Sequence, residues 1–183
     1  AIRFLNGFPL YQTTAEIPEL EASRSGNMPY IYPPIFIFIF IPFTHFHLSI
    51  SGILWDVSVL ALLLFSVSRL IRSFDTEMEA VSKVMVFIFV ASFGPTLTWI
   101  KSGQVSGLLI AFLCLSLVAL RSDHPYWSGV YTTLGSVVKP FYLTSGAHLL
   151  RSRKRLISAL LGGLVLSLLS IVIFGVDTNI QYI

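Results

Sequence analysis

The sequence predicts an all-α fold, a polytopic bundle of helices that cross a membrane. Only 11% of the 183 residues are charged, whereas a soluble domain usually carries about a quarter. The apolar residues are gathered in runs close to the length of a membrane span, and short basic loops separate these runs. An open sheet edge is not tolerated in lipid, so the runs are expected to be helices.

Residues 1–47 are expected to remain outside the spanning part of the bundle. Residues 1–30 are polar and contain several Gly and Pro residues, which predicts an extracytoplasmic loop. Residues 31–47 (IYPPIFIFIFIPFTHFH) are very apolar, but prolines divide them. Aromatic and histidine side chains at the ends of this stretch suit the membrane interface, so we expect an interfacial helix. A true span is the alternative.

Residues 49–175 are expected to hold the transmembrane helices. Four runs read as uninterrupted or nearly uninterrupted spans: 49–71, 84–100, 105–120 and 156–175. A further run, 127–150, has Lys139-Pro140 in its middle. Lysine is costly in hydrocarbon, and proline removes a backbone donor and breaks a helix. We therefore expect a re-entrant break at 139–140, with a half-length helix on each side.

The distribution of basic residues favours this break over a continuous span. If residues 127–138 rise part-way and 141–150 return, most of the loop cations become cytoplasmic. They are Arg69, Arg72, Lys83, Arg121, Arg151, Arg153, Lys154 and Arg155. A helix of twelve residues covers only about 18 Å, so the turn lies below the far surface. In this topology residues 1–47 and Lys139 lie on the outer side, and 176–183 begin the next outer loop.

The outer side is expected to carry a cavity that binds a phosphate. Lys139 supplies a fixed positive charge, and Lys101 and Gln104 are predicted to lie near it, at the start of the following helix. Tyr32 would belong to the outer wall. Other roles are open: Lys139 can snorkel or pair with Asp56, Lys101 can anchor the interface, and Gln104 can bond to backbone.

Other functional classes have little support in the sequence. The formal charge of +3 comes from loop cations that report orientation, so no nucleic-acid partner is expected. No P-loop, HExxH or zinc pattern is present, and the histidines lack metal-ligand spacing. We expect no metal and no cofactor. A transporter or flippase, or a non-catalytic membrane subunit, is the alternative to an enzyme, because broken helices also mark transporter sites.

Four segments, in this order, resemble glycosyltransferase family 87. They are FLNGFPLY at 4–11, YIYPPIFIFIFIPF at 30–43, SGQVSGLLIAFLCLSLVAL at 102–120 and WSGVYTTLGSVVKPFYLTSGAHLLRSRKR at 127–155. The resemblance covers nearly the whole chain. One departure is Ser106, which stands where the family pattern has Asn.

The resemblance implies an enzyme of the GT-C fold in the cell membrane, a multi-pass protein with its active site facing the extracytoplasmic side. It implies transfer of a hexose, usually mannose, from a polyprenyl-phosphate donor to a glycan or glycolipid acceptor. Lys139 would stabilise the leaving phosphate. The acid that acts as base in such enzymes would precede Ala1, and Asp56 is at best a supporting residue. We therefore expect this chain to lack the first helix and the C-terminal part, and to be inactive alone.

Overall fold

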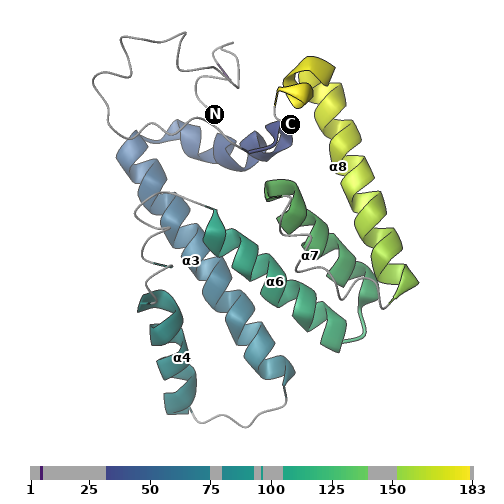
Figure 1. Cartoon of the computed structure of the whole chain (residues 1–183). Helices are drawn as coiled ribbons and strands as arrows, with labels where there is room; N and C mark the ends of the chain where they lie inside the picture. The colour runs from purple at the N-terminus through teal and green to yellow at the C-terminus, as the bar shows by residue number, and fades with distance from the viewer. Residues whose placement is uncertain are drawn as a thin grey trace. The chain divides into compact units, whose positions relative to one another are not determined.

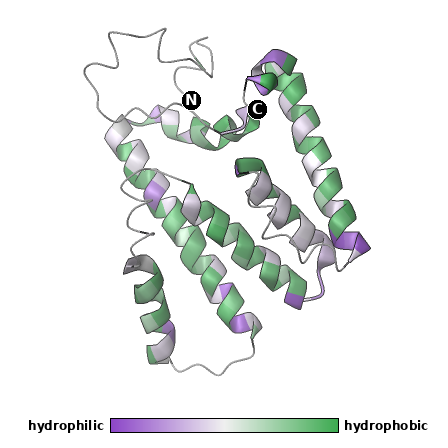
Figure 2. Cartoon of the chain, in the orientation of Figure 1, coloured by the Kyte–Doolittle hydropathy of each residue, from purple (hydrophilic) through white to green (hydrophobic). Residues whose placement is uncertain are grey.

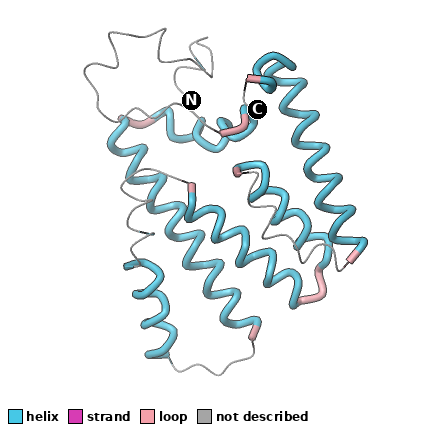
Figure 3. Tube along the Cα trace, in the orientation of Figure 1, coloured by secondary structure: helices cyan, strands magenta, loops and turns pink. Residues whose placement is uncertain are grey.

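The computed structural model describes residues 5, 32–74, 80–92, 96, 105–139 and 152–181. These parts are helical apart from short turns and contain no strand, which confirms the predicted all-α class (Figure 3). The elements in chain order are η2 (Pro34–His45), α3 (Leu48–Ser73), α4 (Ala80–Ser92), α6 (Ser106–Arg121), α7 (Pro125–Val138) and α8 (Arg153–Ile180) (Figure 1). The predicted outer loop 1–30, apart from residue 5, and the returning half-helix 141–150 lie outside the described residues.

The chain divides into two compact units. Unit 1 comprises Ala1–His45 and Val165–Ile183, and unit 2 comprises Phe46–Leu164. Helix α8 therefore contributes its first part to unit 2 and its last part to unit 1. Unit 2 contains Lys139, the central residue of the predicted site, and the helices that position it.

In unit 1 the alternating Ile-Phe segment forms the 3₁₀-helix η2. The N–H of Phe36 donates to the carbonyl of Pro33 at 3.0 Å, the three-residue spacing that defines this helix type. Pro42 lies inside the helix and has no N–H to donate, so the hydrogen-bond ladder is incomplete there. The segment expected as a helix over 31–47 is thus helical over Pro34–His45, and its place at the membrane surface stays a prediction.

Helix α8 bends near its end, in unit 1. Gly175 has φ 80° and ψ 164°, a backbone conformation open to glycine and costly for other residues. The Asn179 side chain holds the bend: its Nδ2 donates to the carbonyls of Ser170 (3.2 Å) and Gly175 (2.7 Å). The Ser170 hydroxyl donates to Asn179 Oδ1 at 2.7 Å. A span over 156–175 is predicted, and the helical conformation resumes after this bend as far as Ile180.

In unit 2, α3 and α6 pack together along their lengths. The buried face of α3 has the spacing of one side of a helix and consists of Trp55, Val59, Leu63 and Ser66. At the far end, Arg121 of α6 closes α3. Its Nε donates to the carbonyl of Ser73 at 2.8 Å, and its guanidinium lies 4.2 Å from the centre of the Phe74 ring. The two helices therefore run in the same direction.

A tight turn joins α6 to α7 and reverses the chain. Asp123 has φ 54°, a left-handed conformation that a short polar side chain tolerates. The His124 N–H donates to the Ala119 carbonyl at 2.9 Å. Pro125 begins α7 at a position where the missing N–H is not needed. Helix α7 packs antiparallel against α6. Because α3 and α7 both contact α6, and α4 contacts α3, these helices of unit 2 lie in the order α4, α3, α6, α7 (Figure 1).

Two described helices are long and apolar enough to cross a membrane. They cover Ser49–Ser73 and Arg153–Ile180, with 25 and 28 residues, and hydrophobic residues dominate both in Figure 2. Helices α4 and α6 are apolar but shorter. Helix α4 starts before the predicted span of 84–100, since a helix can begin in a polar loop before its apolar run does.

Candidate functional site

Lys139 lies at the C-terminal end of α7 and ends the helix. Its backbone is extended (φ −142°, ψ 112°), although its N–H still donates to the carbonyl of Gly135 at 3.1 Å. Proline excludes the helical conformation from the residue before it, so Pro140 accounts for the break. Val138 is only 3% exposed, and Lys139 itself is half-buried. The end of the half-length helix predicted for 127–138 is therefore found at Val138.

Hydroxyl groups attach α7 to α6. The Ser116 hydroxyl lies 3.0 Å from the Ser128 carbonyl, 3.1 Å from the Ser128 hydroxyl and 2.9 Å from the Thr132 hydroxyl. Thr132 also donates to the Ser128 carbonyl at 3.0 Å. All three side chains are buried. Hydrogen bonds of this kind join helices in apolar surroundings, where the hydrophobic effect between helices is weak.

Small residues attach α7 to the first part of α8. Thr133 donates to the Ala159 carbonyl at 2.9 Å, and Ser158 donates to the Tyr126 carbonyl at 2.8 Å. Between these bonds, a Cβ placed on Gly129 would come within 2.6 Å of a backbone oxygen of α8. Only glycine allows this close approach. Helix α7 is thus held on two sides, and Lys139 at its end inherits a defined position.

The packing register places Lys139 near the start of α6. Ser116 pairs with both Ser128 and Thr132, so counting outwards in the antiparallel hairpin brings Lys139 level with Gly107. At about 1.5 Å per residue, Lys139 therefore lies within about one helical turn of Val105, which precedes α6. Lys139 and the start of α6 therefore share one end of unit 2, while the predicted closeness of Lys101 and Gln104 to Lys139 stays a prediction.

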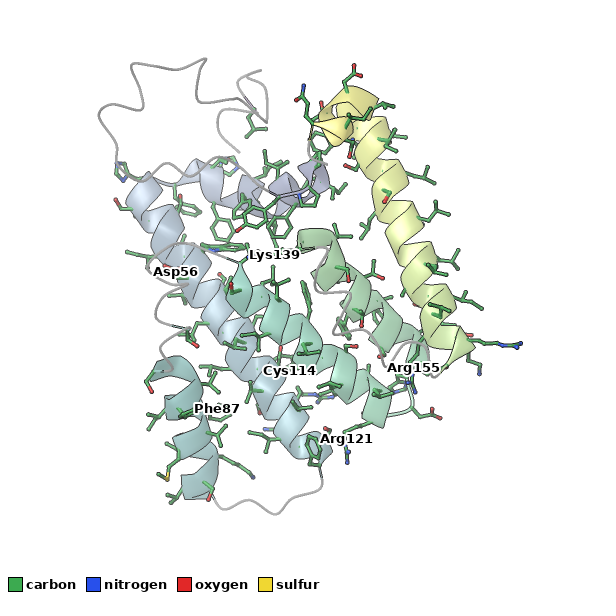
Figure 4. The ribbon with its side chains drawn as sticks, in the orientation of Figure 1. Asp56, Phe87, Cys114, Arg121, Lys139 and Arg155 are labelled. Carbon is green, nitrogen blue, oxygen red and sulfur yellow. The ribbon has the colours of Figure 1, made fainter. Side chains whose placement is uncertain are left out.

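The other predicted site residues are distributed as follows. Lys101 and Gln104 lie outside the described residues. Tyr32 belongs to unit 1, where its ring contacts that of Phe36 at 5.4 Å between centroids. Asp56 lies on α3 in unit 2, and Figure 4 labels it towards the same end of that unit as Lys139. The structure therefore brings Asp56 and Lys139 to one end of unit 2. The predicted closeness of Lys101, Gln104 and Tyr32 to Lys139 stays a prediction.

Most described cations of unit 2 lie at the opposite end, where α3 and α6 end and α7 and α8 begin. Figure 4 labels Arg121 and Arg155 towards this end. These cations are Arg69, Arg72, Lys83 in the first turn of α4, Arg121, Arg153, Lys154 and Arg155. The bundle thus has a basic end and, about 20 Å away along α7, a sparsely charged end that holds Lys139 and Asp56. This separation is the pattern expected of a helix bundle oriented by its charges.

Sequence reasoning missed the side chains that fix α7. Ser128, Thr132 and Ser136 recur every four residues and thus share one face of the helix, a signal that could have marked a helix contact. The role of Gly129 had no such signal, because a close approach depends on the partner helix. Among the described residues, no group of three or more His, Cys, Asp and Glu side chains is placed to hold a metal ion.

Fold and site together define a helical protein in which two of the described helices are able to span a membrane and a lysine ends a helix of 14 residues. The model of glycosyltransferase family 87 matches residues 30–183, and the chain belongs to this family. The resemblance noted in the sequence is thereby confirmed over residues 30–183, whereas the segment 4–11 lies outside the match. Family membership implies glycosyltransferase activity. No curated protein and no solved structure matches the chain.

Proposed function

We propose that the protein is a multi-pass membrane glycosyltransferase with its active site on the extracytoplasmic face. It transfers a hexose from a polyprenyl-phosphate donor to a glycan or glycolipid acceptor, and the hexose proposed is mannose. The observation that carries the proposal is Lys139, a half-buried cation fixed at the end of a half-length helix in an apolar protein of this family. An anionic lipid headgroup is a partner that would compensate the charge of such a lysine.

The chemistry assigned to Lys139 is stabilisation of the leaving group. The acceptor hydroxyl attacks the anomeric carbon of the sugar, the new glycosidic bond forms, and the bond from that carbon to the phosphate oxygen breaks. A base takes the hydroxyl proton, and polyprenyl phosphate departs with the bonding electrons. Negative charge on the leaving oxygen grows during this step, so a nearby ammonium group stabilises the transition state more than the ground state. No described residue is assigned as the base.

The shortness of α7 supports a site inside the membrane boundary. Its 14 residues cover about 21 Å, whereas the hydrocarbon core is about 30 Å thick. If the basic end of unit 2 lies at the cytoplasmic surface, Lys139 stops short of the outer surface. A lipid-linked phosphate lies at that boundary, while its polyprenyl chain remains in the bilayer.

The test is sugar transfer by the full-length protein in lipid nanodiscs, with polyprenyl-phosphate mannose as donor. Lys139→Ala is expected to lower kcat by about 10²- to 10³-fold, the usual effect of removing one group that stabilises a developing anion. Lys139→Arg keeps the charge and is expected to retain more activity. The matched control is Lys154→Ala, which removes an exposed cation at the basic end. Unchanged transfer by a stable Lys139→Ala protein would show that Lys139 does not act on the phosphate.

A further inference from the structure

Asp56 is an acidic residue inside α3, one of the two described helices that are long enough to cross a membrane. Its carboxylate oxygen Oδ1 is buried and has no hydrogen-bond partner among the described residues. The residue follows the buried Trp55 and is itself half-buried, at the border of the face that packs on α6. An acid in this setting is costly without a partner. Asp56 Oδ1 is therefore available to accept a hydrogen bond from a bound ligand.

The depth of Asp56 matches that of Lys139. Arg121 of α6 contacts Ser73 of α3, so the two helices are level at this point. Counting back the same number of residues along each chain segment brings Val57 level with Val105. Asp56 therefore lies close to the level of Val105, and the hairpin register places Lys139 within about one turn of that level. Both charged groups stand at the sparsely charged end of unit 2.

The two groups are offset sideways by helix α6. Helices α3 and α7 each pack against α6, and packed helix axes are about 8–10 Å apart. Asp56 Oδ1 has no hydrogen-bond partner among the described residues, Lys139 included. A ligand with two parts, one for each charge, can occupy both positions at once.

The chemistry of the two side chains assigns the parts. An ionised carboxylate only accepts hydrogen bonds, and it repels a phosphate. The hydroxyl groups of a sugar are donors that suit it, whereas the ammonium of Lys139 suits the phosphate. We propose that Asp56 contacts the sugar of the lipid-linked donor and accepts hydrogen bonds from its hydroxyls. This inference rests on the proposed function and adds to it a residue that reads the sugar.

The test compares two lipids on the same full-length protein in nanodiscs. One probe is polyprenyl-phosphate mannose, and the other is polyprenyl phosphate, which lacks the sugar. Asp56→Ala is expected to weaken binding of the mannose-bearing lipid by about tenfold or more, the effect of losing a hydrogen bond to a charged group. Binding of the sugarless lipid should stay unchanged or tighten, because a repulsive charge is removed. Lys139→Ala should weaken both lipids.

Asp56→Asn provides a second variant of nearly the same shape, and the ratio of the two affinities is measured on folded protein. The inference is overturned if the Asp56 variants weaken both lipids equally or neither of them. The inference is also overturned if neither the Asp56→Ala protein nor the Asp56→Asn protein folds, because Asp56 would then have a structural role. The proposed function fails by a different result: wild-type protein that binds neither lipid.

Discussion

Helices α7 and α8 meet their surroundings in opposite ways. Helix α7 has 14 residues, and those it buries are small or hydroxyl-bearing, apart from Val138. Helix α8 has 28 residues, all described, and only Ser170 is buried. In Figure 2, α7 is mostly pale while α8 is strongly hydrophobic over its length. Helix α7 is thus packed against other helices, whereas α8 leaves most of its apolar side chains exposed, as expected of a helix that spans a membrane.

The difference shows which helix positions the site. Apolar side chains gain little by packing on each other in a membrane, because lipid is equally apolar. Position has to come from close backbone approach and from directional hydrogen bonds. Helix α7 has both: Gly129 allows a close approach to α8, and its hydroxyl groups bond to Ser116 of α6. Helix α7 also carries Lys139. Substitutions in α7 should therefore cost far more stability than those on the exposed face of α8.

The largest effect is expected at Gly129. A Cβ there would lie 2.6 Å from a backbone oxygen and 2.8 Å from the Ser158 Cβ, so Gly129→Ala forces α7 and α8 apart. The expected loss is about 1–3 kcal/mol of unfolding free energy, measured by thermal unfolding in detergent. The matched control is Gly52→Ala in α3, where no atom lies within 4 Å of the new Cβ. It should be neutral or stabilising by about 0.5–1 kcal/mol, and equal destabilisation of both variants would contradict the close contact.

A smaller effect is expected at Ser116. Ser116→Ala removes the hydroxyl that joins α6 to α7, and the expected cost is about 0.6–2 kcal/mol. Ser66→Ala is the control, because that buried hydroxyl donates to the carbonyl of Leu62 within its own helix. A double-mutant cycle with Thr132→Val measures the coupling across the interface directly. A coupling energy of zero would mean that the hydroxyls pack together without stabilising the contact.

The smallest effect is expected on the exposed face of α8. Leu164 is 55% exposed, and Leu164→Ala should change the unfolding free energy by no more than about 0.5 kcal/mol. The measurement is the same thermal unfolding experiment. A loss comparable to that of Gly129→Ala would indicate that protein, not lipid, covers this face.

The sequence predicted the helices whose limits are set by composition. Apolar run length predicted α3 and α6 closely, and Pro140 predicted the end of α7, because proline acts on the residue before it whatever the tertiary context. Helix α4 begins at Ala80, before the apolar run that starts at residue 84, so hydropathy alone did not give its start; the end predicted at residue 100 lies outside the described residues. The bend at Gly175 was expected as a helix end, but Asn179 supplies bonds that allow the helix to resume.

The candidate site was predictable only in part. Lys139 stood out because a lysine in an apolar run is unusual, and Asp56 stood out for the same reason. Their common depth could not be read from the sequence, since it depends on the contacts of Arg121 with Ser73 and of Ser116 with α7. Packing register is set by the contacts between two helices, so the pattern of residues along one helix does not reveal it.

The contact between Arg121 and Ser73 has a consequence for biosynthesis. The two residues are 48 positions apart, and translation at about 5–20 residues per second delivers the arginine a few seconds after the serine. During that interval the last carbonyls of α3 lack this donor. The end of α3 can therefore reach its final packing only after α4 and α6 have left the ribosome. The arginine at the end of α6 then caps a helix that was synthesised before it.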